Sequence, residues 1–393
     1  MVGRSGAKRV VVAGAGEIGR MIAFLLAERR VGRAKWDVLA VDASQETLAR
    51  VKQAAPDALT RRVDFRRAAD LDAAFAGAWA VVSAAPFAFN PLIAERAVAA
   101  GAHYLDLTED VAVTNRVRKL AEKAPTLLVP QCGLAPGFVT IAAMPLVRRM
   151  GVVRSLKLRV GALPRRPSNR LQYNLTWSTA GLVNEYVQEC DVVVGGRPAK
   201  APALQNLERL TLDGVDYEAF NTSGGLSTLP EALAGRVQEL NYKSIRYPGH
   251  CEYMKFLLDD LGFGATPERV AELVRLLDER LPRTREDVVV VYVSAIGDED
   301  GALTERSFAV RVFAVERGGE TWTAIQRTTA GSACATLELM AEGALPRKRG
   351  FVRQDEIPFE AFMATEFGRF AFPDAEAAAA APVPRRRPAS RRG

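Results

Sequence analysis

Histidine and cysteine are scarce in this chain of 393 residues, which has two histidines and four cysteines. The cysteines lie far apart without a CxxC pair, so the ligand spacing of a structural zinc site is missing and we expect no bound metal. So few thiols in a long chain are typical of the reducing cytoplasm, where we expect this protein. The apolar run near the N-terminus breaks at Gly14, and no run of about 18 apolar residues follows, so neither a signal peptide nor a membrane partner is predicted.

Basic charge is scarce outside the C-terminal end. The formal net charge is +7, but five arginines lie in residues 377–393, which contain no acid, and this leaves +2 for the rest of the chain. A nearly neutral body argues against a nucleic-acid partner, which would require basic residues spread over a folded face. The Ala-, Pro- and Arg-rich tail, residues 373–393, is predicted to be disordered.

The remaining composition, 48% hydrophobic and 25% charged, is that of a globular protein, and the length suits two to three domains. In residues 1–140, short β-branched runs alternate with helical stretches, which predicts an α/β, Rossmann-type domain with a doubly wound parallel sheet. The strands predicted there are residues 9–13, 37–41, 80–82, 104–107 and 126–129.

Longer, alternating strands follow in residues 141–327 and predict a second α+β domain with a mixed, largely antiparallel sheet. Residues 328–372 predict a C-terminal helical segment that returns to the first domain. Exposed apolar strands in such a sheet favour a homodimer or a higher homo-oligomer. The predicted strands of the second domain are residues 155–162, 171–177, 208–212, 237–246, 287–295, 307–315 and 321–326.

The strongest local motif is Gly14-Ala15-Gly16-Glu17-Ile18-Gly19, which directly follows the first strand and opens a helix. Gly14 allows a tight turn, Gly16 lets backbone amides approach a diphosphate, and Gly19 permits close packing of helix and sheet. The helix N-terminus adds free N–H groups and partial positive charge. This context predicts a dinucleotide cofactor, held by Gly14, Gly16, Glu17, Ile18 and Gly19.

Three further positions are expected to contact that cofactor. Asp42 ends the second strand, where its carboxylate would bind the ribose hydroxyls and repel a 2′-phosphate. The following Ala43-Ser44 offers no arginine for a 2′-phosphate, so these residues favour NAD over NADP. The alternative role of Asp42 is to cap a helix. Asp64, after the third strand, would face the adenine or be a solvated loop acid. Small residues after the fourth strand leave room for the ribose and nicotinamide, namely Ser83, Ala84 and Ala85.

The next two strands end in residues that could carry chemistry. Asp106 closes the fifth strand with Thr108 and Glu109 beyond it, and we expect Asp106, ahead of Glu109, to meet a substrate ammonium or act as a base. Cys132 lies in the turn after the sixth strand, which should border the nicotinamide. A nucleophilic thiol there would need a histidine partner, so Cys132 is interpreted as a small wall residue.

In the second domain, Arg246 ends a strand just before a helix, where a guanidinium beside free amides makes a good carboxylate receptor. His250 opens that helix and either assists proton transfer or is structural. The last candidate ligands are Thr222 and Ser223, which precede a pair of glycines, and Asn184 with its neighbour Glu185, for which a solvated helix face is the favoured interpretation.

Several of these segments together resemble the saccharopine dehydrogenase-like family over residues 9–370, and within it the lysine 6-dehydrogenase branch. The segments that carry the resemblance are residues 14–19, 103–107, 132–137, 181–186, 222–225, 227–230 and 246–250. Where this chain has Ala135-Pro136-Gly137, saccharopine reductases and carboxynorspermidine dehydrogenases commonly have Asp-Pro-Gly, which favours the lysine-deaminating branch. The resemblance implies that NAD oxidises a primary amine of a small amino acid or diamine, with the lysine ε-amine converted to a semialdehyde and ammonia released.

Two other functions remain open. A saccharopine-type or carboxynorspermidine-type reductase would join an amine to a carbonyl compound, and its larger product would need a second carboxylate receptor, for which Arg165, Arg166 and Arg170 are candidates. A non-catalytic, dinucleotide-binding regulatory protein would bind the cofactor without substrate-dependent production of NADH.

Overall fold

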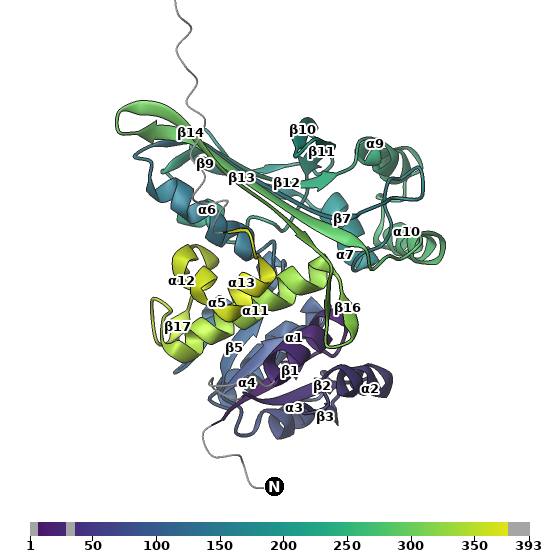
Figure 1. The fold of residues 1–393 in the computed structure, drawn as a ribbon, viewed down its shortest axis with the longest axis vertical. Helices are drawn as coiled ribbons and strands as arrows, with labels where there is room; N and C mark the ends of the chain where they lie inside the picture. The colour runs from purple at the N-terminus through teal and green to yellow at the C-terminus, as the bar shows by residue number, and fades with distance from the viewer. Residues whose placement is uncertain (1–6, 29–35, 376–393) are drawn as a thin grey trace, which may run out of the picture.

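The computed structural model describes residues 7–28 and 36–375, which form two large sheets with helices packed around them (Figure 1). The first sheet is parallel throughout, in the order β17-β6-β5-β4-β1-β2-β3. Its strands are β1 (Lys8–Ala13), β2 (Trp36–Asp42), β3 (Leu59–Arg62), β4 (Ala80–Ser83), β5 (His103–Asp106), β6 (Leu127–Val129) and β17 (Gly350–Phe351). From β1 the chain adds β2 and β3 on one side and then β4, β5 and β6 on the other, so the topological switch point lies between β1 and β4. In open α/β sheets, ligands bind at the carboxyl ends of the strands at this point.

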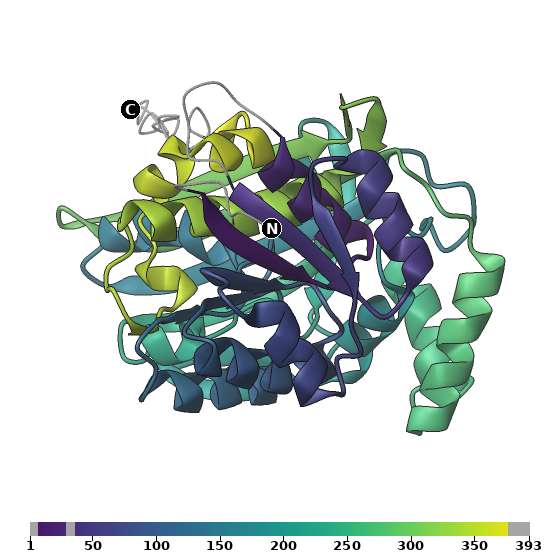
Figure 2. The same ribbon diagram turned by 90° about the horizontal axis from the view of Figure 1, so that it is seen from below.

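Helices cover both faces of this sheet (Figure 2). Successive side chains of a strand point to opposite faces, so the apolar residues are divided between the two layers of helices. Val10 and Val12 of β1 face the layer with α1 and α2, whereas Val11 and Ala13 face the layer with α3, α4 and α5. The helices are α1 (Glu17–Ala27), α2 (Gln45–Ala54), α3 (Ala68–Phe75), α4 (Asn90–Ala99) and α5 (Val111–Ala121). The predicted doubly wound α/β domain is confirmed.

The second sheet is mixed, in the order β10-β11-β12-β7-β13-β14, with β8 paired to β12 and β9 paired to β8. Only the β12–β7 pair is parallel, so the predicted mixed, largely antiparallel sheet is confirmed. Its strands are β7 (Val153–Pro164), β8 (Cys190–Val194), β9 (Arg197–Ala201), β10 (Glu208–Leu212), β11 (Val215–Asn221), β12 (Val237–Arg246), β13 (Asp287–Glu299) and β14 (Ala302–Phe313). Its helices are α7 (Thr179–Val187), α8 (Leu229–Ala232), α9 (His250–Lys255), η2 (Phe256–Asp260) and α10 (Pro267–Arg280).

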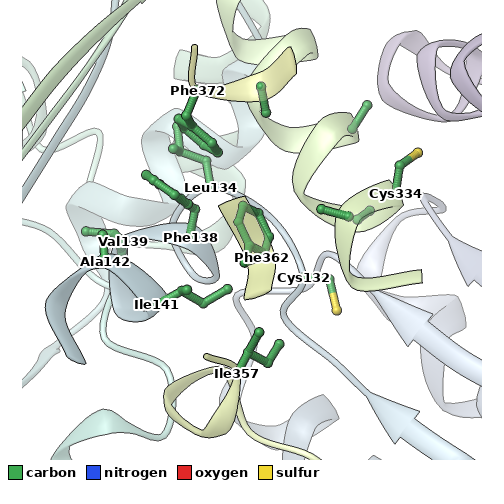
Figure 3. Packing of buried hydrophobic residues seen from close by; sticks show 14 of the residues in the cluster. Cys132, Leu134, Phe138, Val139, Ile141, Ala142, Cys334, Ile357, Phe362 and Phe372 are labelled. Carbon is green, nitrogen blue, oxygen red and sulfur yellow. The ribbon is translucent and has the colours of Figure 1, made fainter. Parts of the chain in front are cut away.

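One apolar cluster joins the two sheets, because it contains Val12 of the first and Val291 of the second. Helices α6 and α11 lie between the sheets, and the last helices of the described chain pack onto them (Figure 1). Phe138 of α6 stacks on Phe372, with ring centroids 3.4 Å apart, and Phe362 packs beside them (Figure 3). The remaining elements are η1 (Phe87–Phe89), α6 (Phe138–Arg148), the hairpin β15 (Val315–Arg317) and β16 (Glu320–Trp322), α11 (Ala324–Glu342), η3 (Gln354–Glu356), α12 (Phe359–Ala364) and α13 (Glu366–Ala371).

Two predicted strands of the second domain are wrong. Residues 171–177 form no strand, since Gln172 has a positive φ of 55° and the side chain of Asn169 donates to the carbonyl of Tyr173, which closes a turn. Residues 321–326 divide into the end of β16 and the start of α11. Thr323 and Gln326 form a capping box there, and this starts a helix where β-branched residues had indicated a strand.

The predicted disordered tail lies, from residue 376 onward, outside the described residues. None of the helices in the described chain is long and apolar enough to cross a membrane. Within residues 7–28 and 36–375, no group of three or more histidine, cysteine, aspartate or glutamate side chains is placed to hold a metal ion.

Candidate active site

The turn between β1 and α1 admits only glycine at two positions. Gly14 has a φ of +97°, and a Cβ on it would lie 2.6 Å from the amide nitrogen of Ala85, while a Cβ on Gly19 would lie 1.8 Å from the carbonyl oxygen of Gly14. Gly16 instead faces open space, because a Cβ there meets no atom within 4 Å, and as the N-cap of α1 it supplies no side-chain cap. The first amides of α1 are therefore open to an anionic ligand, which the helix dipole favours.

Asp42 lies beside this turn at the end of β2. Its Oδ2 accepts a hydrogen bond from the Ala15 amide (2.7 Å) and its Oδ1 accepts one from the Ser44 amide (2.8 Å). Ser44 itself caps α2, so Asp42 does not serve as that cap. Its half-buried carboxylate keeps lone pairs for further donors such as ribose hydroxyls.

Asp64 is held differently. Its two oxygens each lie 2.9 Å from a nitrogen of Arg66, and these hydrogen bonds lower the pKa of Asp64 to about 2. The Asp64 carboxylate is therefore paired with Arg66, and Asp64 does not line the cleft at the end of the first sheet.

A cleft of about 1080 Å³ opens at the carboxyl ends of the first sheet and is closed on its other side by the second domain. The first domain contributes residues 16–18, 84–87, 90, 107–109 and 133–136. The second domain contributes residues 175–178, 184, 185, 242, 244, 246 and 283–285. Helix α11 contributes residues 325, 326 and 329. The glycine turn is thus part of the same cavity as polar groups from both domains.

Of the two acids at the end of β5, Glu109 lines this cleft and Asp106 does not. Asp106 is fully buried, and its Oδ1 accepts hydrogen bonds from the amides of Thr108 and Gln131, both at 3.0 Å. Burial raises the pKa of Asp106 to about 6. Contrary to the expected preference for Asp106, this residue joins two loops beneath the cleft, and the acid at this strand end that faces the cleft is Glu109.

Glu185 of α7 also lines the cleft and is only 8% exposed, so the expected solvated helix face is wrong for this residue. Asn184 lines the cleft beside it. Burial raises the pKa of both Glu185 and Glu109, and the negative charge of Glu109 raises that of Glu185 further. Two carboxyl groups from different domains therefore face one cavity in an environment that favours taking up a proton or a cation.

Arg246 provides the counter-charge. Its Nε donates to the Tyr186 hydroxyl (2.8 Å) and its Nη1 to the carbonyl of Ile245 (2.8 Å). Its Nη2 lies 3.7 Å from Oε2 of Glu185, longer than a hydrogen bond, and the side chain lines the cleft although it is only 2% exposed. Nη2 therefore keeps a donor for a ligand in the cleft, and the predicted role of Arg246 as a carboxylate receptor stays a prediction.

Family models match nearly the whole chain. The saccharopine dehydrogenase NADP binding domain matches residues 10–128, and the saccharopine dehydrogenase C-terminal domain matches residues 133–367. The chain belongs to the saccharopine dehydrogenase family. It is an NAD(P)-binding oxidoreductase of this family, whose members act on amino or amine groups.

Two solved structures share the architecture of this family member. One is apo saccharopine dehydrogenase (L-Glu forming) from Saccharomyces cerevisiae, with 15% identity and a TM-score of 0.76 over 93% of this chain and 98% of that chain. The other is a homospermidine synthase from Legionella pneumophila in complex with NAD, with 12% identity and a TM-score of 0.62 over 93% of this chain and 91% of that chain. At such low identity the likeness concerns the fold.

The glycine turn of this saccharopine dehydrogenase family member fits a dinucleotide. Gly14 lets the turn pack directly against the backbone of Ala84 and Ala85, and the absence of a side chain at Gly16 leaves the first amides of α1 open to the cleft. One expectation about the cofactor changes, because Arg62 donates from Nε to the carbonyl of Ala43 (3.0 Å). An arginine therefore does lie beside Ala43, and the argument against a 2′-phosphate is left to Asp42 alone.

His250 does not reach the cleft. The ring is fully buried, with Nδ1 2.9 Å from the carbonyl oxygen of Leu171 and Nε2 3.1 Å from the hydroxyl of Tyr186. Burial and the charge of Arg246 lower the pKa of His250 to about 3. A neutral imidazole with both nitrogens engaged cannot carry protons to a substrate, so the alternative structural role is the one that this geometry supports.

Other predicted residues also lie behind the lining. Cys132 is buried, with its Sγ 2.9 Å from the carbonyl oxygen of Val129, and burial raises the pKa of its thiol far above the usual range. Residues 133–136 of the same turn, and not Cys132, line the cleft. Ser83 donates to Oδ1 of Asn90 (2.7 Å). Thr222 pairs its hydroxyl with that of Ser244, and Ser223 donates its amide to the carbonyl of Glu185 (3.1 Å). These groups hold lining residues in place.

The sequence reasoning missed several lining residues. Tyr242 could have been found, since the period of two along β12 places it with Ser244 on the face that carries Arg246. No comparable signal marks Trp177 or Arg285, because both belong to irregular segments whose direction only the fold determines.

Proposed function

We propose that this protein is an NAD-dependent oxidoreductase that acts on the CH–NH₂ group of an amino acid, and that its reaction is the oxidative deamination of the lysine ε-amine, the activity of a lysine 6-dehydrogenase. The observation that carries the proposal is the pair of carboxyl groups, Glu109 and Glu185, that face the cleft in which the glycine turn lies. Asp42 beside the turn supports NAD as the cofactor.

The carboxyl pair provides the proton chemistry. An ammonium group cannot release hydride from its neighbouring carbon, so a base must first take a proton from the ε-ammonium. Glu185 in its carboxylate form accepts that proton, and its raised pKa lowers the cost of the transfer. When both acids are ionised, they and Arg246 carry a net negative charge, which attracts the cationic amine.

Oxidation then follows from positioning. A bound nicotinamide would supply the hydride acceptor, and residues 133–136, which form one wall of the cleft, would border it. Loss of hydride from the ε-carbon leaves an iminium ion, water adds to its carbon, and ammonia departs with the aldehyde left behind. The semialdehyde can cyclise onto its own α-amine. Arg246 binds the substrate carboxylate through Nη2, and this contact positions the reacting ε-carbon within the cleft.

A substrate screen at 340 nm tests the proposal. We expect NADH to appear with lysine and NAD, more slowly with NADP, and weakly or not at all with ornithine, diamines or saccharopine. Absence of any amine-dependent reduction of either nucleotide would overturn it.

One observation favours a second function, a reductase that joins an amine to a carbonyl compound. The predicted second carboxylate receptor is not where the sequence suggested, since Arg165, Arg166 and Arg170 do not line the cleft. Two other arginines, Arg283 and Arg285, do line it. Turnover of saccharopine, with none of lysine, would favour this second function.

A further inference from the structure

Arg285 is a cleft-lining cation without a carboxylate partner. It is exposed in the loop before β13, and the hydrogen bond of its side chain is a long one, from Nη1 to the carbonyl oxygen of Thr321 (3.3 Å). No carboxylate among residues 7–28 and 36–375 lies within 4.0 Å of its guanidinium. Arg283 in the same loop differs, because its Nη2 lies 2.6 Å from Oδ1 of Asp278.

A network of hydrogen bonds joins the strand that follows this loop to the first domain. Asp287, two residues after Arg285, accepts hydrogen bonds from the amides of Ala324 and Ile325 at the start of α11 (2.5 and 3.0 Å). In the same turn of α11, Gln326 donates to Oε2 of Glu17 in the first turn of α1 (2.5 Å). The start of β13, the start of α11 and the start of α1 are therefore tied together.

The hairpin that Arg285 touches is tied to α1 as well. Glu320 precedes Thr321 and forms an ion pair with Arg20 of α1. Arg20 also lies over the ring of Trp322 in the hairpin, with its guanidinium carbon 4.7 Å from the ring centroid. Arg285 is thus held on the side of the cleft where α1 begins.

Among the described residues of the first domain, no lysine or arginine lines the cleft at the start of α1. The helix offers amides and roughly half a positive charge, whereas a diphosphate carries about two negative charges. Glu17 adds an acid at this place, and the two nearby arginines are directed at that acid: Arg20 Nη2 lies 3.3 Å from Oε2 of Glu17, and Arg50 Nη1 lies 3.7 Å from Oε1. A cation from the facing domain would therefore balance the ligand.

We propose that Arg285 reaches from the second domain to the diphosphate of the dinucleotide bound at the Gly14–Gly19 turn, so that the cofactor is held by both domains. The proposal rests on the dinucleotide site and is independent of which amine is oxidised. It assigns the unpaired arginine to the cofactor, and it leaves carboxylate recognition to Arg246.

Binding of phosphate-containing and phosphate-free probes to the full-length protein tests this assignment. We expect R285A to weaken ADP-ribose and NADH at least about tenfold and to lower the salt dependence of their binding, while competition by adenosine stays within twofold of wild type. R285K should retain part of the affinity. R275A, which removes an exposed arginine of α10 outside the cleft, is the matched control and should bind all three probes normally.

Unchanged affinity of R285A for ADP-ribose would overturn the proposal, provided that its melting temperature matches wild type; R285Q serves if R285A does not fold. A second outcome also overturns it. If R285A binds ADP-ribose normally but loses affinity for lysine and not for 1,5-diaminopentane, measured by calorimetry with NADH present, Arg285 binds the substrate carboxylate. These binding measurements need no turnover. If the protein is inactive with every amine, the proposed function is refuted, but the role of Arg285 in cofactor binding is still tested.

Discussion

Gly16 and Gly151 are a matched pair of open glycines, because a Cβ on either meets no atom within 4 Å and neither has a positive φ. Gly16 caps α1 at the proposed diphosphate site, whereas Gly151 precedes β7. We expect G16A to melt at the wild-type temperature but to bind NADH about tenfold more weakly, since its methyl group would occupy the approach to the amides. G151A should bind normally. Equal NADH affinity in all three proteins, measured by fluorescence titration, would argue against this turn as the diphosphate site.

The two carboxyl groups of the cleft predict a pH dependence. Burial raises the pKa of Glu185, so the base is lost by protonation as the pH falls through a value above the ordinary glutamate range. We expect kcat for lysine to fall on the acid side of the pH profile at this raised pKa. E109Q removes the charge that raises the pKa of Glu185, so its fall in kcat should move to lower pH.

E185Q should reduce kcat by about a hundredfold or more, which is the usual worth of a positioned base. Exposed Glu272 of α10 provides the control, and E272Q should leave both the pH profile and kcat unchanged. An E109Q profile that superimposes on wild type would show that the two acids do not interact during catalysis.

Residue types at the strand ends could be predicted from the sequence, but their directions could not. Both Asp106 and Glu109 follow β5, and nothing in the one-dimensional pattern shows that the first is held under the loops by two amides. His250 illustrates the same point, since only the fold reveals that both its nitrogens are engaged. Burial comes from segments distant in the sequence, and it decides which titratable groups face a ligand.

At the scale of elements, Asp287 couples β13 to α11. It is fully buried, and its carboxylate accepts two amides of the first turn of α11. We expect D287A to lower the free energy of unfolding by about 1 to 3 kcal/mol, because the buried amide of Ala324 and the partly buried amide of Ile325 lose their acceptor. D287N keeps one acceptor oxygen and should lose less. Urea unfolding measures the effect, with E286A at the exposed neighbouring position as control; equal stability of D287A and wild type would contradict it.

Five strands of the first sheet, β1, β2, β4, β5 and β6, were predictable to within two residues, because buried parallel strands are continuous β-branched runs with turn residues on either side. No range was predicted for β3, whose residues are exposed, or for the short β17. The segment 321–326 was not predictable, since its β-branched and aromatic residues favour a strand while the capping box at Thr323 starts a helix. Local propensity and capping compete there, and packing of α11 against α1 decides between them.

At the scale of the whole molecule, the cleft needs both domains. Glu109 comes from the first domain, and Glu185, Arg246 and Arg285 come from three separate segments of the second. Sequence patterns fix each segment within its own sheet, but the relative placement of the sheets depends on α6 and α11, which pack between them (Figure 1). This is why the family and the cofactor turn were predictable and the full lining of the cleft was not.

The shared core also predicts how the molecule unfolds. A single apolar cluster contains residues of both sheets. If one domain unfolds, the other therefore loses part of its own core packing. We expect one calorimetric transition whose van't Hoff and calorimetric enthalpies agree. NADH at a hundred times its dissociation constant should stabilise the folded state by about 2.7 kcal/mol and move this one transition upward as a whole. Two separate transitions, of which NADH raises only one, would show that the domains unfold independently and that the cofactor contacts only the first.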